Sequence, residues 1–178
     1  RAVQRLETHM PVWPIPKLFR IANKKKLIKG IFEGSTINTP SMICVEDVLD
    51  ALKWVTSIGG SKELVNISNE NLKIVEEWVN KSEWVKFMCE DKNSRSATSI
   101  TLSIKDEWFN KFDEEKQRET VKKIVSTLKK EGVAEDINGY PKAPPSLRIW
   151  GGSTVQNSDL KALLPWIDWA YNSVKNNA

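Results

Sequence analysis

The chain has 178 residues, of which 40% are hydrophobic and 28% charged, and this is the composition of one soluble globular domain with a core of its own. Its 27 basic and 23 acidic residues give a formal net charge of only +4, spread along the chain, which argues against a nucleic-acid-binding protein. The two cysteines lie far apart and there is only one histidine, so the sequence contains no zinc-binding pattern. It also has no signal-peptide pattern and no apolar stretch of membrane-spanning length, which predicts a cytoplasmic protein.

The first forty residues predict short elements separated by loops. Residues 1–7 favour a helix, and the prolines around Trp13 make residues 10–17 an extended connector, because proline is excluded from helix interiors. Residues 18–21 and 27–32 are predicted to be short strands joined by a polar turn. The chain begins without an initiator methionine, and we expect it to be a piece of a longer protein.

A polar loop, residues 34–39, ends at a predicted helix start and is the first candidate binding site. Thr39 suits an N-cap and Pro40 the first helical turn, so the loop delivers Asn38 and Thr39 to a helix N-terminus. Unpaired backbone N–H groups and the positive end of the helix dipole favour a phosphate or carboxylate there, and residues 40–43 include no acid that would compete. On local grounds alone, such a motif is more often only a helix cap.

From residue 41 onward the sequence predicts an α+β domain, with a small antiparallel or mixed sheet and helices on one face. Apolar residues at helical spacing predict a well-buried helix from residue 41 to the glycine pair at 59–60, and a second helix at about 61–80. The other predicted elements are strands at 84–88, 99–104, 133–137 and 147–150, and helices at 106–112, 114–130 and 160–174.

Arg148 is the second candidate for a binding residue. It stands between Leu147 and Ile149 in a predicted strand that is otherwise apolar, and a guanidinium in such a place needs an anionic partner. Its fork of N–H groups fits a planar carboxylate best. The alternative is that strand alternation turns Arg148 outward, to water or to a structural Asp or Glu. Lys142 lies shortly before it in the sequence and could bring a second cation to the same ligand.

Four blocks of sequence occur in this order: residues 13–20 (WPIPKLFR), 34–42 (GSTINTPSM), 48–54 (VLDALKW) and 143–150 (APPSLRIW). Together they resemble phosphoserine aminotransferase, most closely the form found in alphaproteobacteria and their relatives. The resemblance runs over essentially the whole chain but covers only about the C-terminal half of a full member. It implies a fold-type I enzyme dependent on pyridoxal 5'-phosphate, with residues 1–40 leading from the large domain and residues 41–178 forming the small C-terminal domain.

The resemblance also implies an activity and a set of site residues. Members of the family are homodimers that transfer an amino group between glutamate and 3-phosphohydroxypyruvate, giving phosphoserine and 2-oxoglutarate in serine biosynthesis; pyridoxine biosynthesis is a second pathway to consider. Asn38 and Thr39 would contact the cofactor phosphate held in the partner subunit's site. Arg148 would bind the substrate carboxylate, and Lys142 is the cation available for the substrate phosphate.

The family's pattern is incomplete in this chain. In the family, the lysine that binds pyridoxal phosphate covalently lies upstream of the point where this chain starts, so no catalytic residue is assigned and we expect the chain alone to be inactive. The His-Arg pair that binds the substrate phosphate in many members is absent, and only Lys142 is nearby. His9 stands where the family form has a tyrosine and is given no function. The alternatives are a fragment of another fold-type I aminotransferase and a non-catalytic anion-binding module.

Overall fold

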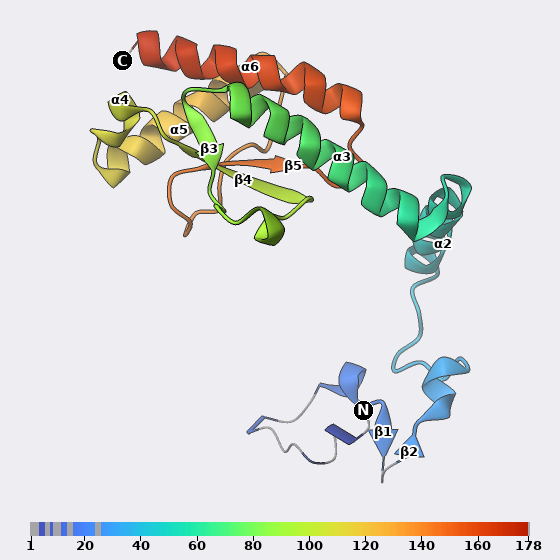
Figure 1. Cartoon of the computed structure of the whole chain (residues 1–178). Coiled ribbons are helices and arrows are strands. Elements are labelled where there is room, and N and C mark those ends of the chain that lie inside the picture. Colours follow the sequence, from blue (N-terminus) through green and yellow to red (C-terminus); the bar gives the residue numbers. More distant parts are fainter. Residues whose placement is uncertain (1–3, 6–7, 9–11, 14–15, 24–25, 178) are drawn as a thin grey trace. The chain divides into compact units, whose positions relative to one another are not determined.

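The computed structural model describes residues 4–5, 8, 12–13, 16–23 and 26–177. The chain forms two compact units, Arg1–Trp54 (the first unit) and Val55–Ala178 (the second unit) (Figure 1). Of the predicted N-terminal helix, Gln4 and Arg5 are helical. Residues 1–3 and 6–7, and His9 as well, lie outside the described residues.

The first unit has only short elements before its helix. A 3-10 turn, η1 (Lys17–Phe19), is followed by the strands β1 (Ala22–Asn23) and β2 (Lys26–Leu27), which pair antiparallel, and by a second turn, η2 (Lys29–Phe32). The strands predicted at 18–21 and 27–32 are therefore wrong in extent, although a short antiparallel pair is present. Phe19 and Phe32 remain exposed, and a two-stranded ribbon with no buried face does not extend into longer strands.

Helix α2 (Met42–Ser57) begins two residues after Pro40, which was predicted to open the first helical turn. The Ser41 carbonyl accepts a hydrogen bond from the Val45 N–H at 3.1 Å, so Ser41 rather than Thr39 directly precedes the first turn. Ser41 is itself a favoured N-cap residue and stands next to the apolar run, which explains the shift. The prediction that α2 is well buried is wrong, because none of its side chains is buried. Apolar spacing shows which face of a helix can be buried, and the described residues do not cover that face.

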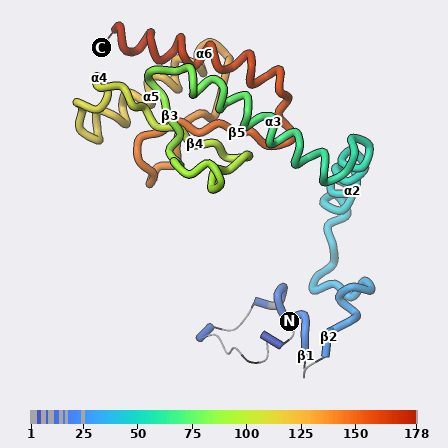
Figure 2. The backbone as a smooth tube through the Cα atoms, in the orientation of Figure 1, coloured from blue at the N-terminus to red at the C-terminus, as the bar shows by residue number. Residues whose placement is uncertain are grey.

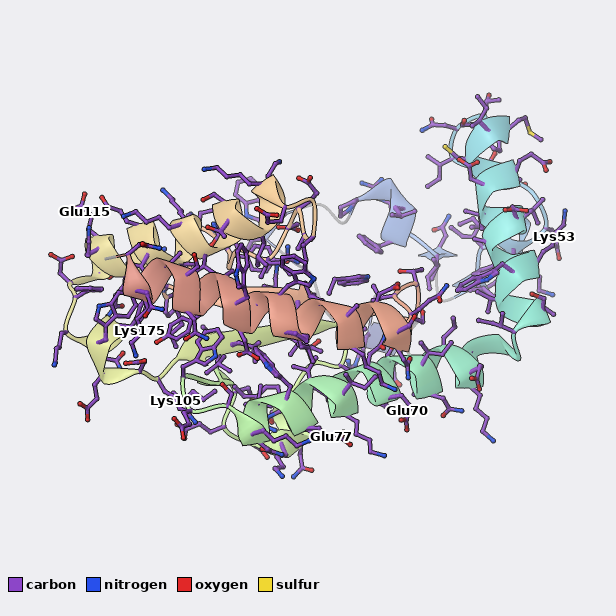
Figure 3. The ribbon with its side chains drawn as sticks, turned by 90° about the horizontal axis from the view of Figure 1, so that it is seen from above. Lys53, Glu70, Glu77, Lys105, Glu115 and Lys175 are labelled. Atoms are coloured by element: carbon purple, nitrogen blue, oxygen red, sulfur yellow. The ribbon has the colours of Figure 1, made fainter. Side chains whose placement is uncertain are left out.

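The second unit is a three-stranded antiparallel sheet with helices on one face. Strands β3 (Val85–Phe87), β4 (Ser99–Ile104) and β5 (Leu147–Trp150) pair in this order. Helices α3 (Gly60–Lys81), α5 (Glu114–Lys130) and α6 (Asn157–Asn176) cover the sheet, and seen from above α6 lies between the other two (Figure 3). Their inward side chains form one core, which includes Val75, Val79, Val85, Phe87, Ile100, Leu102, Val121, Ile124, Leu128, Leu147, Ile149, Leu160, Leu164 and Ile167. The predicted α+β fold is confirmed.

Local sequence explains where the helices of the second unit begin. Gly59 and Gly60, with φ of 115° and 76°, adopt the left-handed conformation that separates α2 from α3, and this conformation favours glycine. The Asp113 side chain caps α5 by accepting a hydrogen bond from the Lys116 N–H at 2.8 Å. Figure 2 shows α3 and α6 running side by side, and their contacts bring together segments far apart in the sequence.

The strand predicted at residues 133–137 is wrong. This segment makes an isolated bridge, from Asn138 to Leu147, and the Ile137 carbonyl accepts a hydrogen bond from the Arg148 N–H at 2.8 Å. Glu135 and Asp136 interrupt the apolar run and are exposed, so the segment has too short a buried face to form a strand. It runs instead beside the edge of β5 that faces away from β4.

Asp106 joins the start of a short helix, α4 (Glu107–Asn110), to the end of α6. Its carboxylate caps α4 through the Trp108 N–H at 2.8 Å and accepts hydrogen bonds from Tyr171 Oη and Lys175 Nζ. Burial acts to raise the pKa of Asp106, but these donors outweigh it and lower the pKa to about 2. Burial and the bond to Asp106 raise the pKa of Tyr171, whose ring stacks on Trp84 with centroids 3.9 Å apart.

Candidate functional site

The two predicted pairs of site residues lie in different units. Asn38 and Thr39 are exposed residues of the first unit, in the loop between η2 and α2. They stand shortly before the first turn of α2, and that turn carries no acidic residue. The backbone N–H groups of the turn and the positive end of its dipole favour an anion. This part of the chain therefore fits a phosphate group, and the role of Asn38 and Thr39 stays a prediction.

Arg148 lies on β5, on the face of the sheet opposite the helices. Leu147 and Ile149 on either side of it are buried in the core, and strand alternation turns Arg148 to the other face, where it stands opposite Thr101 of β4. Its side chain is nevertheless only 14% exposed. The Tyr140 ring covers the guanidinium, with the ring centroid 4.8 Å from the guanidinium carbon.

Among the described residues, Arg148 has one anionic partner and one buried donor that lacks a partner. Its Nη2 donates to the Asp136 carboxylate, which is 75% exposed, so the structural acid foreseen as an alternative is present. Its Nε is buried and has no hydrogen-bond partner among the described residues. A buried donor without an acceptor costs on the order of 1–3 kcal/mol, so the edge of the guanidinium formed by Nε and Nη2 suits a further acceptor. A planar carboxylate at this edge would satisfy both groups.

Lys142 lies in a loop of residues 139–146, which also carries Tyr140. The ends of the loop meet where the Gly139 N–H donates to the Ser146 carbonyl at 3.0 Å. A Cβ added to Gly139 would lie 2.2 Å from Ser146 Oγ, so a larger residue here would force the Ser146 side chain to move. The Lys142 side chain is exposed. Tyr140 thus links the two predicted substrate ligands, because it shares a loop with Lys142 and its ring covers Arg148. Among the described residues, no hydrogen bond or ion pair joins Lys142 to Arg148.

Sequence reasoning does not find two residues that shape this site. Asp136 is the partner of Arg148, and its only signal is that an acid interrupts an apolar run. Arg118 of α5 donates to the carbonyls of Pro141 and Ala143, at 3.2 and 2.9 Å. In the sequence, Arg118 is marked only by its i,i+4 spacing from Glu114, which indicates a pair on the surface of a helix and nothing more.

The described residues contain neither a metal-binding cluster nor a membrane-spanning helix. No three or more His, Cys, Asp or Glu side chains in the described ranges are grouped so that they could hold a metal ion. Within the same part of the chain, every helix is too short or too polar to cross a membrane. The second unit presents the cationic side chains of Arg148 and Lys142, and the first unit presents the N–H groups at the start of α2; each of these suits an organic anion.

Comparison with known proteins finds relatives along almost the whole chain. The phosphoserine aminotransferase of Methanosarcina barkeri is 49% identical over 175 residues, which are 98% of this chain and 45% of that protein. The phosphoserine aminotransferase of Methanosarcina mazei is 47% identical over the same shares. The chain matches the C-terminal part of phosphoserine aminotransferases. The resemblance predicted from four sequence blocks is therefore confirmed, and the chain spans slightly less than half the length of these relatives. No protein-family model matches it.

Solved structures of phosphoserine aminotransferases share the fold. One from Bacillus circulans subsp. alkalophilus aligns with a TM-score of 0.67 and 19% identity, over 89% of this chain and 39% of that one. Another, studied for radiation damage of its Schiff base, aligns with a TM-score of 0.67 and 17% identity, over 92% of this chain and 40% of that one. The helices and small antiparallel sheets match the C-terminal part of these phosphoserine aminotransferases.

Proposed function

We propose that the chain is the C-terminal part of a pyridoxal-phosphate-dependent aminotransferase that converts glutamate and 3-phosphohydroxypyruvate to 2-oxoglutarate and phosphoserine. The observation that carries the proposal is Arg148, an almost buried guanidinium whose Nε has no partner in the described part of the chain, which is 49% identical to the phosphoserine aminotransferase of M. barkeri. A place in serine biosynthesis, a cytoplasmic location and a homodimer with shared sites belong to the same proposal. So does the division into a leading segment, residues 1–40, and a small domain, residues 41–178.

In this proposal the second unit anchors both ends of the substrate. Arg148 binds the α-carboxylate through Nε and Nη2, and the carboxylate takes the place that Asp136 holds at Nη2 or shares it. Lys142 binds the phosphate as a point charge on a flexible stem. Two anchors restrict the rotation of the substrate, which lowers the entropy that must be lost on the way to the reactive geometry.

Asn38 and Thr39 are the residues of the chain that fit a cofactor phosphate. They precede an acid-free first turn of α2, and in the dimer they would reach the site of the partner subunit. Pyridoxal phosphate, when bound, supplies the carbonyl that takes up the amino group and the conjugated ring that stabilises negative charge. The lysine that holds it is assigned to the N-terminal part of the enzyme, so the residues of this chain bind and orient, and we expect the chain alone to be inactive.

A chimera tests the proposal. The N-terminal part of the M. barkeri phosphoserine aminotransferase is placed before this chain, and the product is assayed with phosphoserine and 2-oxoglutarate. We expect phosphoserine-dependent formation of glutamate by the chimera and none by the chain alone. After incubation with pyridoxal phosphate and reduction with borohydride, intact mass should show one adduct on the chimera and none on the chain. A stoichiometric adduct on the chain alone would contradict the assignment of the lysine to the N-terminal part of the enzyme.

An aminotransferase for an unphosphorylated substrate is the second candidate. The observation that favours it is that the predicted phosphate ligand, Lys142, is an exposed side chain on a loop. A panel of phosphoserine, serine, alanine and aspartate with 2-oxoglutarate separates the two candidates. A kcat/KM for phosphoserine that is about tenfold or more above that for serine supports the proposed function, since one charged contact contributes about that much. Equal values would support the second candidate.

A further inference from the structure

We propose that Arg118 of α5 positions Lys142 for the substrate phosphate. The inference rests on the proposed function, because it requires Lys142 to be a substrate ligand. Arg118 lies on a helix, away from the strand that carries Arg148, and we give it no contact with substrate. The reason for the proposal is that its guanidinium binds the backbone on both sides of Lys142.

The contacts of Arg118 with the loop are two hydrogen bonds to main-chain carbonyls. Its Nη1 donates to the carbonyl of Pro141 at 3.2 Å, and its Nη2 donates to the carbonyl of Ala143 at 2.9 Å. These two residues directly precede and follow Lys142. One planar cation therefore holds the main chain at the residue before the lysine and at the residue after it, which a single flexible ammonium could not do with the same geometry.

Glu114 holds Arg118 in place from the helix side. Its Oε1 accepts hydrogen bonds from Arg118 Nε at 3.0 Å and Nη2 at 2.6 Å, one turn apart on α5. The Arg118 side chain is 33% exposed, so the pair lies at the surface and its own contribution to stability is small. Its effect is to orient the guanidinium, because a donor that is already held loses less entropy when it binds the loop.

A cavity beneath the loop explains why the loop depends on polar contacts. It has a volume of about 300 Å³, and its lining includes Arg118, Val121 and Lys122 on α5 and Tyr140, Pro141 and Pro144 on the loop. Where a segment does not pack on the helix below it, few apolar contacts resist its motion. The Ala143 N–H donates to the Tyr140 carbonyl at 2.9 Å and shapes the turn from within. The bonds from Arg118 tie that turn to α5.

Fixing the backbone of Lys142 matters for binding because the side chain itself is flexible. A lysine loses much of its rotamer freedom when it is ordered, and a mobile backbone would add to this loss. With the backbone held by Arg118, the ammonium samples a smaller volume, and its effective concentration at the substrate phosphate rises. Arg118 should therefore affect the KM of a phosphorylated substrate and leave that of glutamate, which has no phosphate, almost unchanged.

The experiment uses the chimera, with phosphoserine and glutamate as separate amino donors. We expect Arg118→Gln to raise the KM for phosphoserine about fivefold, roughly the net contribution of one ordinary hydrogen bond, and to change the KM for glutamate by less than about twofold. Lys122→Gln is the matched control, because it removes one positive charge from α5 at the same cavity. It should change neither KM. Arg118→Lys, which keeps the charge and loses the fork, should lie between the wild type and Arg118→Gln.

A double-mutant cycle distinguishes positioning from a general effect on structure. If Arg118 acts through Lys142, the variant with both Arg118→Gln and Lys142→Ala has the same phosphoserine KM as Lys142→Ala alone. Effects that multiply would overturn the inference. A raised KM in Lys142→Ala with none in Arg118→Gln would overturn it too, while leaving the proposed function intact. An unchanged KM in Lys142→Ala would remove both the phosphate assignment and the inference. Thermal melts verify that each variant is folded. If Arg118→Gln does not fold, Arg118→Lys takes its place in the double-mutant cycle.

Discussion

Replacement of Arg148 by alanine in the chimera should abolish most activity without unfolding the protein. The side chain is 14% exposed, its Nε is buried and unpaired among the described residues, and its Nη2 is paired with an exposed carboxylate. A bound substrate carboxylate would make two charge-assisted hydrogen bonds at this edge. Alanine removes both, so the substitution acts on binding and on the transition state alike.

The size of the loss follows from these two bonds. A hydrogen bond to a charged group contributes about 1.5–3 kcal/mol, and the two bonds together, not fully additive, contribute on the order of 2–4 kcal/mol. At 1.36 kcal/mol for each factor of ten, kcat/KM for phosphoserine should fall about 30- to 1,000-fold. The ion pair with the exposed Asp136 contributes at most about 1 kcal/mol, so the free energy of unfolding should change little.

Steady-state kinetics and urea unfolding of the same variants measure the two effects. Arg148→Lys provides the comparison, because it keeps the charge but cannot present two parallel N–H groups, and it should recover only part of the activity. A loss of less than about threefold in Arg148→Ala would refute the assignment, since that is below the contribution of one charged hydrogen bond. A large loss of stability with an equal loss of activity would show a structural role instead.

Three further predictions concern single side chains. Asp136→Asn removes the carboxylate that competes with the substrate for Arg148. It should lower the KM for phosphoserine in steady-state assays about two- to fivefold, which corresponds to the free energy of one exposed ion pair. A higher KM would contradict this prediction. The pKa of Asp106 is lowered from 3.8 to about 2, so its contribution to stability is present above pH 4 and is lost as the pH falls toward 2. In urea unfolding, the free energy of unfolding of the Asp106→Asn variant should fall less steeply between pH 4 and pH 2 than that of the wild type. Equal pH dependence in the two proteins would be evidence against this role of Asp106. Ile124→Ala, at a fully buried position, should cost about 2–5 kcal/mol of unfolding free energy, against about 0.5 kcal/mol for Ile43→Ala at an exposed one.

The sequence predicts those elements whose ends and faces are set by nearby residues. Helix α5 was expected at 114–130 and has these bounds, because Asp113 caps its start and Gly132, in the left-handed conformation, follows its end. Strand β4 has the predicted bounds as well, since Ile and Leu alternate with Ser and Thr and every second side chain enters the core. In both cases a local pattern and the tertiary environment agree.

The remaining features depend on contacts between distant segments. The apolar row of α2 is visible in the sequence, but whether it is buried depends on surfaces that the described residues do not supply. The strand position of Arg148 follows from its neighbours, whereas its contacts with Asp136 and Tyr140 depend on how the chain returns beside β5. The bonds of Arg118 to the loop join residues more than twenty positions apart, and no helical period or turn signal predicts them.

The stack of Trp84 on Tyr171 gives the second unit an optical signal of its own. The Trp84 indole N–H donates to the Asp168 carboxylate at 2.7 Å, which places a charge beside the ring and fixes it against α6. Trp13, Trp150, Trp166 and Trp169 are exposed and within reach of an aqueous quencher such as iodide, whereas Trp84 is buried. The emission that survives iodide therefore comes from Trp84 together with the half-buried Trp78 and Trp108, whose rings meet Trp84 and Tyr171 edge-on. A shift of that emission to longer wavelength marks the moment when water enters this aromatic cluster beside α6.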